Sequence, residues 1–337
     1  HDLSEQSIAI QKPEPTVIGA GGKVPGATLE YTLNFQISDF FAFENVVVTD
    51  TISDGQHLDL TFTPTLSITE QGSTSSGTFN AANYTETRNW EDEGSPPFTY
   101  DDGDGTTVME FRVSAELITR TVGGQILGGC VDPAGDAPPD DGDCDLFNAG
   151  ATTGTITFRT VIQDDFTETY PSDPSVDHGD VLTNTVIIDG DILDNENFIL
   201  TGNAEADNSG TSLVIDKGVH TKTIYAVDGS TSFSNPVKVS PGSTVTYRLT
   251  YTLPSSDFED LYFLDYLPLP IFDVDDETWS FDPTIDASIP ASGTIKFGPT
   301  ETFYPSNPGF SNYSPSITPN SASNYLRIDY GSYDDPA

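Results

Sequence analysis

The chain has 337 residues, enough for two or three domains that each bury a core, so one compact unit is not expected. Asp and Glu outnumber Lys and Arg by 53 to 12, which gives a net charge of -41. Self-repulsion of this size disfavours nucleic acid and anionic membrane surfaces as partners and favours a salty, cation-rich setting. No apolar run reaches the ~20 residues that a membrane helix needs, so we expect no membrane insertion in this segment.

The residue types predict an all-β chain, because Thr, Val, Ile, Tyr and Phe dominate while the usual helix formers are scarce. Alternating or β-branched runs recur between clusters of Gly, Pro, Asp, Asn and Ser, at the spacing of sandwich strands. In the first part of the chain these runs cover residues 7–11, 28–37, 45–52, 58–68, 108–117, 154–163 and 181–190. In the second part they cover residues 212–219, 243–253, 260–267, 278–285 and 325–331.

A polar, acidic stretch between residues 189 and 211 marks the expected domain boundary. We predict a first β-sandwich over 1–200 with a long insertion at about 70–150, an acidic linker over 201–211, and a second sandwich over 212–337. The second half has fewer strands than the first. It is therefore expected to be a β-sandwich that is incomplete at its C-terminal end, within a longer modular chain.

The two halves contain an internal repeat, which reveals more of the architecture than a strand count does. Three pairs of segments match: IAIQK (8–12) with LVIDK (213–217), PGATLEYTLNFQI (25–37) with PGSTVTYRLTYTL (241–253), and VVVTDT (46–51) with LYFLDY (261–266). The repeat places Lys12 over Lys217 and Asp50 over Asp265. An acidic residue inside a strand of Val and Thr is therefore a feature of both halves.

The order of these motifs resembles the isopeptide-forming immunoglobulin-like repeat domains of bacterial pilins and large secreted surface adhesins, of the collagen-adhesin A type. The motifs are a Lys ending the first strand, a PG turn before a long strand, a TDT strand and a late LTNT strand (182–185). The resemblance implies tandem immunoglobulin-like β-sandwich domains. It also implies a crosslink in which the Lys12 amine attacks the Asn184 amide, ammonia leaves, and Asp50 assists as an acid.

Elementary chemistry supports these roles. Burial lowers the pKa of a lysine and frees its nucleophilic amine, and burial raises the pKa of a carboxyl group that can then shuttle protons. In the second half, Lys217 and Asp265 are the expected equivalents, without a matching Asn before the sequence ends. The alternative is an ordinary ion pair between Lys12 and Asp50, or outward-facing side chains on an edge strand, with Asn184 capping a turn.

The chain contains two cysteines, Cys130 and Cys144, in a segment rich in Gly, Pro and Asp. In an oxidising compartment we expect them to form a disulfide that closes a small loop. The alternative is a pair of free thiols.

Acidic loops are the candidate metal sites, because Ca²⁺ prefers six to eight oxygen ligands from flexible loops. We expect calcium, if a metal binds, at Asp189, Asp191 and Asp194 near the domain boundary. The alternative is a solvated acidic loop, since carboxylates cluster by chance in so acidic a chain. No other cofactor is expected.

Catalysis on an external substrate is not predicted, because the four histidines lack a zinc spacing and no nucleophile elbow or phosphate loop occurs. We expect a structural or adhesive module of an extracellular prokaryotic surface protein or filament. Its partners would be neighbouring copies or further domains of the same long chain. The rival interpretations are an adhesin tip that binds a host or environmental surface ligand through the insertion, and a polymerising subunit completed by a neighbour's strand.

Overall fold

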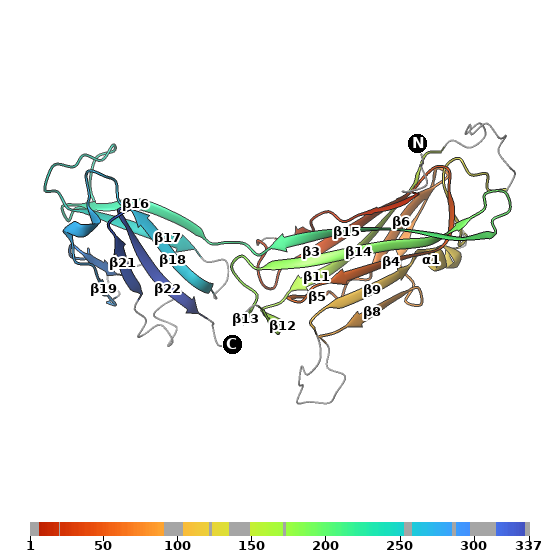
Figure 1. Cartoon of the computed structure of the whole chain (residues 1–337), viewed down its shortest axis with the longest axis horizontal. Helices are drawn as coiled ribbons and strands as arrows, with labels where there is room; N and C mark the ends of the chain where they lie inside the picture. The colour runs from red at the N-terminus through yellow and green to blue at the C-terminus, as the bar shows by residue number, and fades with distance from the viewer. Residues whose placement is uncertain are drawn as a thin grey trace, which may run out of the picture. The chain divides into compact units, whose positions relative to one another are not determined.

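The computed structural model describes residues 7–19, 21–90, 104–120, 123–134, 149–170, 173–252, 258–284, 288–296 and 315–333. The chain divides into two compact units, His1–Asp216 and Lys217–Ala337 (Figure 1). Within the described residues, strands dominate, and the helical elements are α1 (Val113–Thr119) and the 3-10 turn η2 (Val274–Asp276). This confirms the all-β prediction. No helix in the described part is long and apolar enough to span a membrane.

Unit 1 is a sandwich of two antiparallel sheets (Figure 1). The first sheet has the order β1 (Ile8–Gln11), β3 (Thr28–Ile37), β11 (Thr152–Ile162), β6 (Thr65–Glu70) and β7 (Ser73–Thr78), with β2 (Thr16–Ile18) beside β3 and β5 (Gln56–Leu58) beside β11. The second sheet has the order β15 (Leu200–Val214), β14 (Val181–Leu193), β4 (Ala42–Ile52), β9 (Thr107–Arg112) and β8 (Tyr84–Arg88), with β10 (Ile126–Leu127) beside β4. A separate hairpin joins β12 (Asp165–Tyr170) and β13 (Asp173–Ser175).

The core of unit 1 lies between these sheets. Side chains alternate between buried and exposed along β3, β4, β11 and β14, as expected for strands with one face on a core. Tyr31 of β3 stacks on Phe158 of β11 at 5.1 Å between ring centroids. Phe158 also contacts Phe111 of the other sheet at 6.2 Å. Aromatic side chains therefore join the two sheets, next to β4, where the alternation of buried side chains turns Asp50 inward.

The expected insertion at about 70–150 is wrong in its described part. β7 pairs with β6, while β8 and β9 extend the second sheet beside β4. These strands are integral to the sandwich rather than added to it. Residues 91–103 and 135–148 of this stretch lie outside the described residues.

The acidic linker expected over 201–211 is instead part of β15, which pairs with β14 from Val214 to Ala204 and again at Leu200. The boundary between the units falls after Asp216. Polarity misled the sequence-based assignment, because β15 is an outer strand with mostly exposed side chains and pairs only with β14 in the described chain.

Unit 2 contains a hairpin of β16 (Val219–Val227) and β17 (Val245–Thr252) and a sheet of β18 (Phe258–Tyr266), β22 (Tyr325–Tyr333) and β21 (Ser316–Asn320), in that order. A short parallel pair joins β19 (Ser280–Asp282) and β20 (Thr294–Lys296). Val274, Leu326 and Ile328 form the buried core, and Leu249 and Phe263 pack against it. Side chains from β17, β18 and β22 therefore meet in one core.

Candidate functional site

The inward direction of Lys12 follows from the strand before it. Ile8 and Ile10 are buried, so the period of two carries Lys12 to the same inner face. β1 pairs with β3 along one edge. On its other side, the Ile10 backbone N–H donates to Asp207 Oδ2 at 2.8 Å and the Lys12 backbone N–H donates to Ser209 Oγ at 3.1 Å. Side chains of β15 thus anchor β1 between the two sheets, with Lys12 pointing into the core.

Lys12 and Asp50 form a fully buried ion pair. The Lys12 Nζ atom contacts Asp50 Oδ2, and both side chains are 0% exposed. Asp50 faces inward because it lies two residues from buried Val48 and two from buried Ile52 on β4. The lysine nitrogen also lies over two aromatic rings, 4.8 Å from the Tyr31 centroid and 5.2 Å from the Phe158 centroid.

Asn184 lies beside this pair. On β14, Asn184 is opposite Ile52 and Val186 is opposite Asp50, so Asn184 and Asp50 are diagonal neighbours on the inner face. Asn184 is 1% exposed, and neither of its amide atoms has a hydrogen bond of ordinary geometry in the described structure. Asp50 Oδ1 is also without one. A buried amide that lacks well-formed hydrogen bonds costs about 1–3 kcal/mol, so fold stability does not explain its presence.

Burial changes the protonation of the pair. Burial lowers the pKa of Lys12 from 10.5 to about 8, against the opposing charge of Asp50. Burial raises the pKa of Asp50 from 3.8 to about 6, against the opposing effects of Lys12 and Asn184. Both shifts narrow the gap between the two pKa values, so moving the proton from lysine to carboxylate costs less free energy here than between the same groups in water. A neutral amine beside a neutral carboxyl group is therefore accessible.

Tyr31 closes the site on the side of the first sheet. Its hydroxyl donates to Gln56 Oε1 at 2.9 Å, and Gln56 Oε1 also accepts from Thr160 Oγ1 at 3.1 Å. Burial raises the pKa of Tyr31, with Asn184 opposing this effect, so the phenol stays neutral. Sequence reasoning aligned Tyr31 with Tyr247 in the repeat but did not identify either as part of a site.

In unit 2 the lysine that contacts Asp265 is Lys222, not Lys217. Lys222 Nζ contacts Asp265 Oδ1 and lies 4.3 Å from the Tyr247 ring centroid, as Lys12 lies over Tyr31. Lys217 is exposed and precedes β16. The assignment of Lys217 as the crosslinking lysine of the second repeat is therefore not supported by its position.

Strand register explains why Lys222, and not Lys217, corresponds to Lys12. Lys222 is opposite Leu249, and the β1–β3 register, Gln11 to Asn34, continues to Lys12 opposite Leu33. Each leucine lies eight residues after the proline of its PG turn. Lys222 is thus the structural counterpart of Lys12.

A buried asparagine of unit 2 has a different role. The Asn324 amide donates to the Leu267 and Phe272 carbonyl oxygens at 2.9 Å each, and its Oδ1 accepts from the Val274 N–H at 2.9 Å. These bonds fix the backbone around η2. Asn324 is therefore a structural residue, in contrast to Asn184.

The predicted disulfide and metal site stay predictions. Cys130 is described, whereas Cys144 lies outside the described residues. In the described part of the chain, no three His, Cys, Asp or Glu side chains gather so as to hold a metal ion, and this includes Asp189, Asp191 and Asp194. Asp191 Oδ2 accepts from Asn45 Nδ2 at 2.9 Å, and Asp194 Oδ1 accepts a backbone N–H of its own turn.

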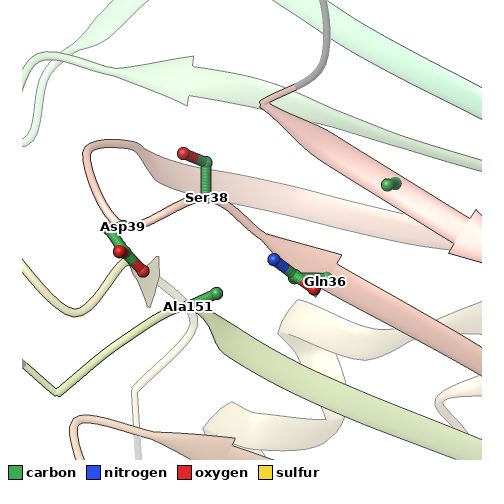
Figure 2. A pocket seen from close by; sticks show the side chains of 5 residues that line it. Gln36, Ser38, Asp39 and Ala151 are labelled. Atoms are coloured by element: carbon green, nitrogen blue, oxygen red, sulfur yellow. The ribbon is translucent and has the colours of Figure 1, made fainter. Parts of the chain in front are cut away.

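A shallow pocket of about 240 Å³ lies near one end of the first sheet, lined by Ala9, Gln36, Ser38, Asp39 and Ala151 (Figure 2). Ala9 pairs with Gln36, and both alternate with buried neighbours, so the pocket opens on the outer face of the sheet. It is thus separate from the buried lysine, which points to the inner face.

The sequence matches no protein-family model and no curated protein. Among solved structures, it is similar to the major pilin SpaD of Corynebacterium diphtheriae at 11% identity and a TM-score of 0.29, over 64% of this chain and 36% of that chain. The major pilin subunit BcpA of Bacillus cereus matches at 12% identity and 0.30, over 85% and 70%. The collagen-binding subdomain of the Enterococcus faecalis surface protein ACE matches at 10% and 0.26, over 60% and 94%.

Proposed function

We propose that this chain is a structural module of an extracellular surface protein or filament, in which unit 1 is stiffened by a self-formed amide bond between Lys12 and Asn184. Its partners are further domains of the same polypeptide or neighbouring copies. The net charge of -41 supports an exposed, soluble surface in a cation-rich medium.

One observation carries the proposal: a fully buried Lys12–Asp50 pair adjoins the amide of Asn184, which makes no ordinary hydrogen bond. The neutral Lys12 amine attacks Asn184 Cγ, and a C–N bond forms as the bond to Nδ2 breaks. Asp50 first donates a proton to the amide and then receives one from the attacking nitrogen, so ammonia leaves and the carboxyl group is restored. Fixed neighbours on packed strands supply the high effective concentration that this single turnover needs.

The bond would have a mechanical consequence. It joins the residue that follows β1 to a residue of β14, 172 positions later in the sequence. A force that pulls the ends of unit 1 apart would meet a covalent bond rather than the hydrogen bonds of a strand pair. This is the property that a module under tension requires.

Proteolysis followed by tandem mass spectrometry tests the proposal. A branched peptide that contains both Lys12 and Asn184 is expected from the parent chain and absent from the Asn184→Ala variant. Asn203→Ala, at an exposed position on β15, is the matched control and should retain the branched peptide. Recovery of Lys12 and Asn184 only in separate, unmodified peptides would refute the crosslink.

A further inference from the structure

The sheet of unit 2 repeats part of the second sheet of unit 1. The order β18-β22-β21 corresponds to β4-β9-β8. Asp265 is opposite Leu326 of β22, as Asp50 is opposite Met109 of β9. The correspondence is therefore one of register as well as of order.

A local backbone feature supports the same alignment. Asp260 has φ 43° and Asn45 has φ 55°. Each lies five residues before the acidic residue of its strand, and left-handed backbone is uncommon outside glycine. β18 and β4 thus have the same backbone irregularity, a residue with positive φ, as well as corresponding partner strands.

One edge of β18 has no strand partner among the described residues of unit 2. In unit 1, β4 lies between β9 and β14, whereas in the described residues of unit 2 the pairing of β18 is with β22 alone. By the correspondence above, the open edge is the one that β14 covers in unit 1. β14 is also the strand that carries Asn184.

The lysine and aspartate side chains are more exposed in unit 2 than in unit 1, as expected if the edge of β18 is uncovered. The Lys12 and Asp50 side chains are both 0% exposed, but those of Lys222 and Asp265 are 30% and 9% exposed. On the outer face of β18, Tyr262 is 45% exposed. An open strand edge with large apolar side chains is a template for strand addition.

We propose that the open edge of β18 binds an extended segment with the sequence pattern of β14, and that Lys222 forms an amide bond with an asparagine of that segment. The register of unit 1 fixes where this asparagine lies. Asn184 is opposite Ile52, two residues after Asp50, so the incoming asparagine pairs opposite Leu267. The residue two positions later, apolar like Val186, pairs opposite Asp265. The inference rests on the chemistry proposed for unit 1.

The covalent step balances without a further reactant. Lys222 transfers a proton to Asp265, and its amine then attacks Cγ of the incoming asparagine, where the new C–N bond replaces the bond to the amide nitrogen. Asp265 donates one proton to the leaving nitrogen and accepts one from the attacking nitrogen. The products are a secondary amide and ammonia.

A synthetic peptide with the sequence of residues 180–189, DVLTNTVIID, is the probe, incubated with the full chain. We expect an adduct with the mass of chain plus peptide less about 17 Da, for the lost ammonia, that fragmentation maps to Lys222. The same peptide with alanine at its asparagine should bind without forming an adduct. Lys222→Arg should abolish the adduct, and Asp265→Ala should slow its formation by about 100-fold or more. Lys217→Arg should leave it unchanged, because Lys217 is exposed and precedes β16.

Three results would overturn the inference: no peptide binding, binding without an adduct, or an adduct on a lysine other than Lys222. Dimerisation of the chain through β18 would also overturn the inference, because a second copy would then occupy the edge. Light scattering detects such a dimer, and neither peptide would prevent it. The two proposals fail separately. A chain that has lost ammonia within unit 1 but forms no adduct contradicts only this inference, and an adduct on a chain of unmodified mass contradicts only the crosslink of unit 1.

Discussion

Replacing Asp50 with asparagine removes the proposed acid while keeping the shape of its side chain. We expect the variant to retain its full, unmodified mass, since an amide cannot shuttle the protons that the reaction requires. The stability of unit 1 should fall for two reasons. By the loop-closure estimate, a bond across 172 residues contributes about 5 kcal/mol, and this is lost. In the variant, Lys12 stays an uncrosslinked amine with a side chain that is 0% exposed, and it lacks the carboxylate that Asp50 supplies; an unpaired buried charge of this kind costs about 3–5 kcal/mol.

The combined loss is comparable with the whole stability of an ordinary domain, about 5–15 kcal/mol, so unit 1 should unfold at much lower denaturant concentration. Urea unfolding followed by aromatic fluorescence, with intact mass on the same samples, measures both effects. Asp265→Asn is the matched control: it should preserve the loss of ammonia and destabilise unit 2 by only about 1 kcal/mol, because its lysine is partly solvated. An Asp50→Asn chain that is as light and as stable as the parent would refute the role of Asp50.

Three further predictions follow from the same geometry. When unreacted chain is refolded, the amide bond should form fastest between about pH 6 and pH 8. The rate should fall on both sides, because the buried pair of Lys12 and Asp50 gains a proton below this window and loses one above it. Mass spectrometry of timed samples measures the rate. Gly154→Ala should lower the free energy of unfolding by about 1–3 kcal/mol, since a Cβ atom would lie 2.0 Å from the Phe35 ring. Gly77→Ala should change it by less than about 0.5 kcal/mol, because a Cβ atom there would make only an ordinary van der Waals contact, 3.8 Å from Arg120 Nη2. Lys222→Ala should destabilise unit 2 by about 1 kcal/mol because it leaves a buried carboxylate unpaired, and Lys217→Ala should have no measurable effect on its urea midpoint.

The repeat predicted the parts of the fold that depend on register within a strand. The PG turn and the alternation after it placed Tyr31 and Tyr247 at the same position, and the acidic residue of each half faces inward. These features could be predicted from the sequence because side chains alternate along a strand, so once one face is buried, the face of every other residue is fixed.

Lys222 was missed for a related reason. Similarity of letters favoured LVIDK over the less similar VHTK, although the first of these segments ends β15 and leads out of unit 1. Only the pairing of β16 with β17 shows which lysine lies opposite Leu249. Register between strands is a property of tertiary structure, and sequence similarity over five residues does not determine it.

Strand β15 was missed because the usual signal of a strand is an apolar face. Its side chains are mostly exposed, and two of its polar residues, Asp207 and Ser209, accept hydrogen bonds from the backbone of β1. A strand that binds its neighbour through polar side chains resembles a linker in composition. Strand β15 nevertheless holds Lys12 at the site through the hydrogen bond from its backbone N–H to Ser209.

The most direct test of the crosslink is the intact mass of the reduced and fully denatured chain. Reduction removes any contribution from a disulfide, and denaturation removes every non-covalent contact. The bond between Lys12 and Asn184 predicts a mass about 17 Da below that of the sequence, restored to the sequence value, apart from the substitution itself, in Asn184→Ala. A parent chain whose mass equals that of its unmodified sequence would contradict the crosslink and leave Lys12 and Asp50 as a buried ion pair.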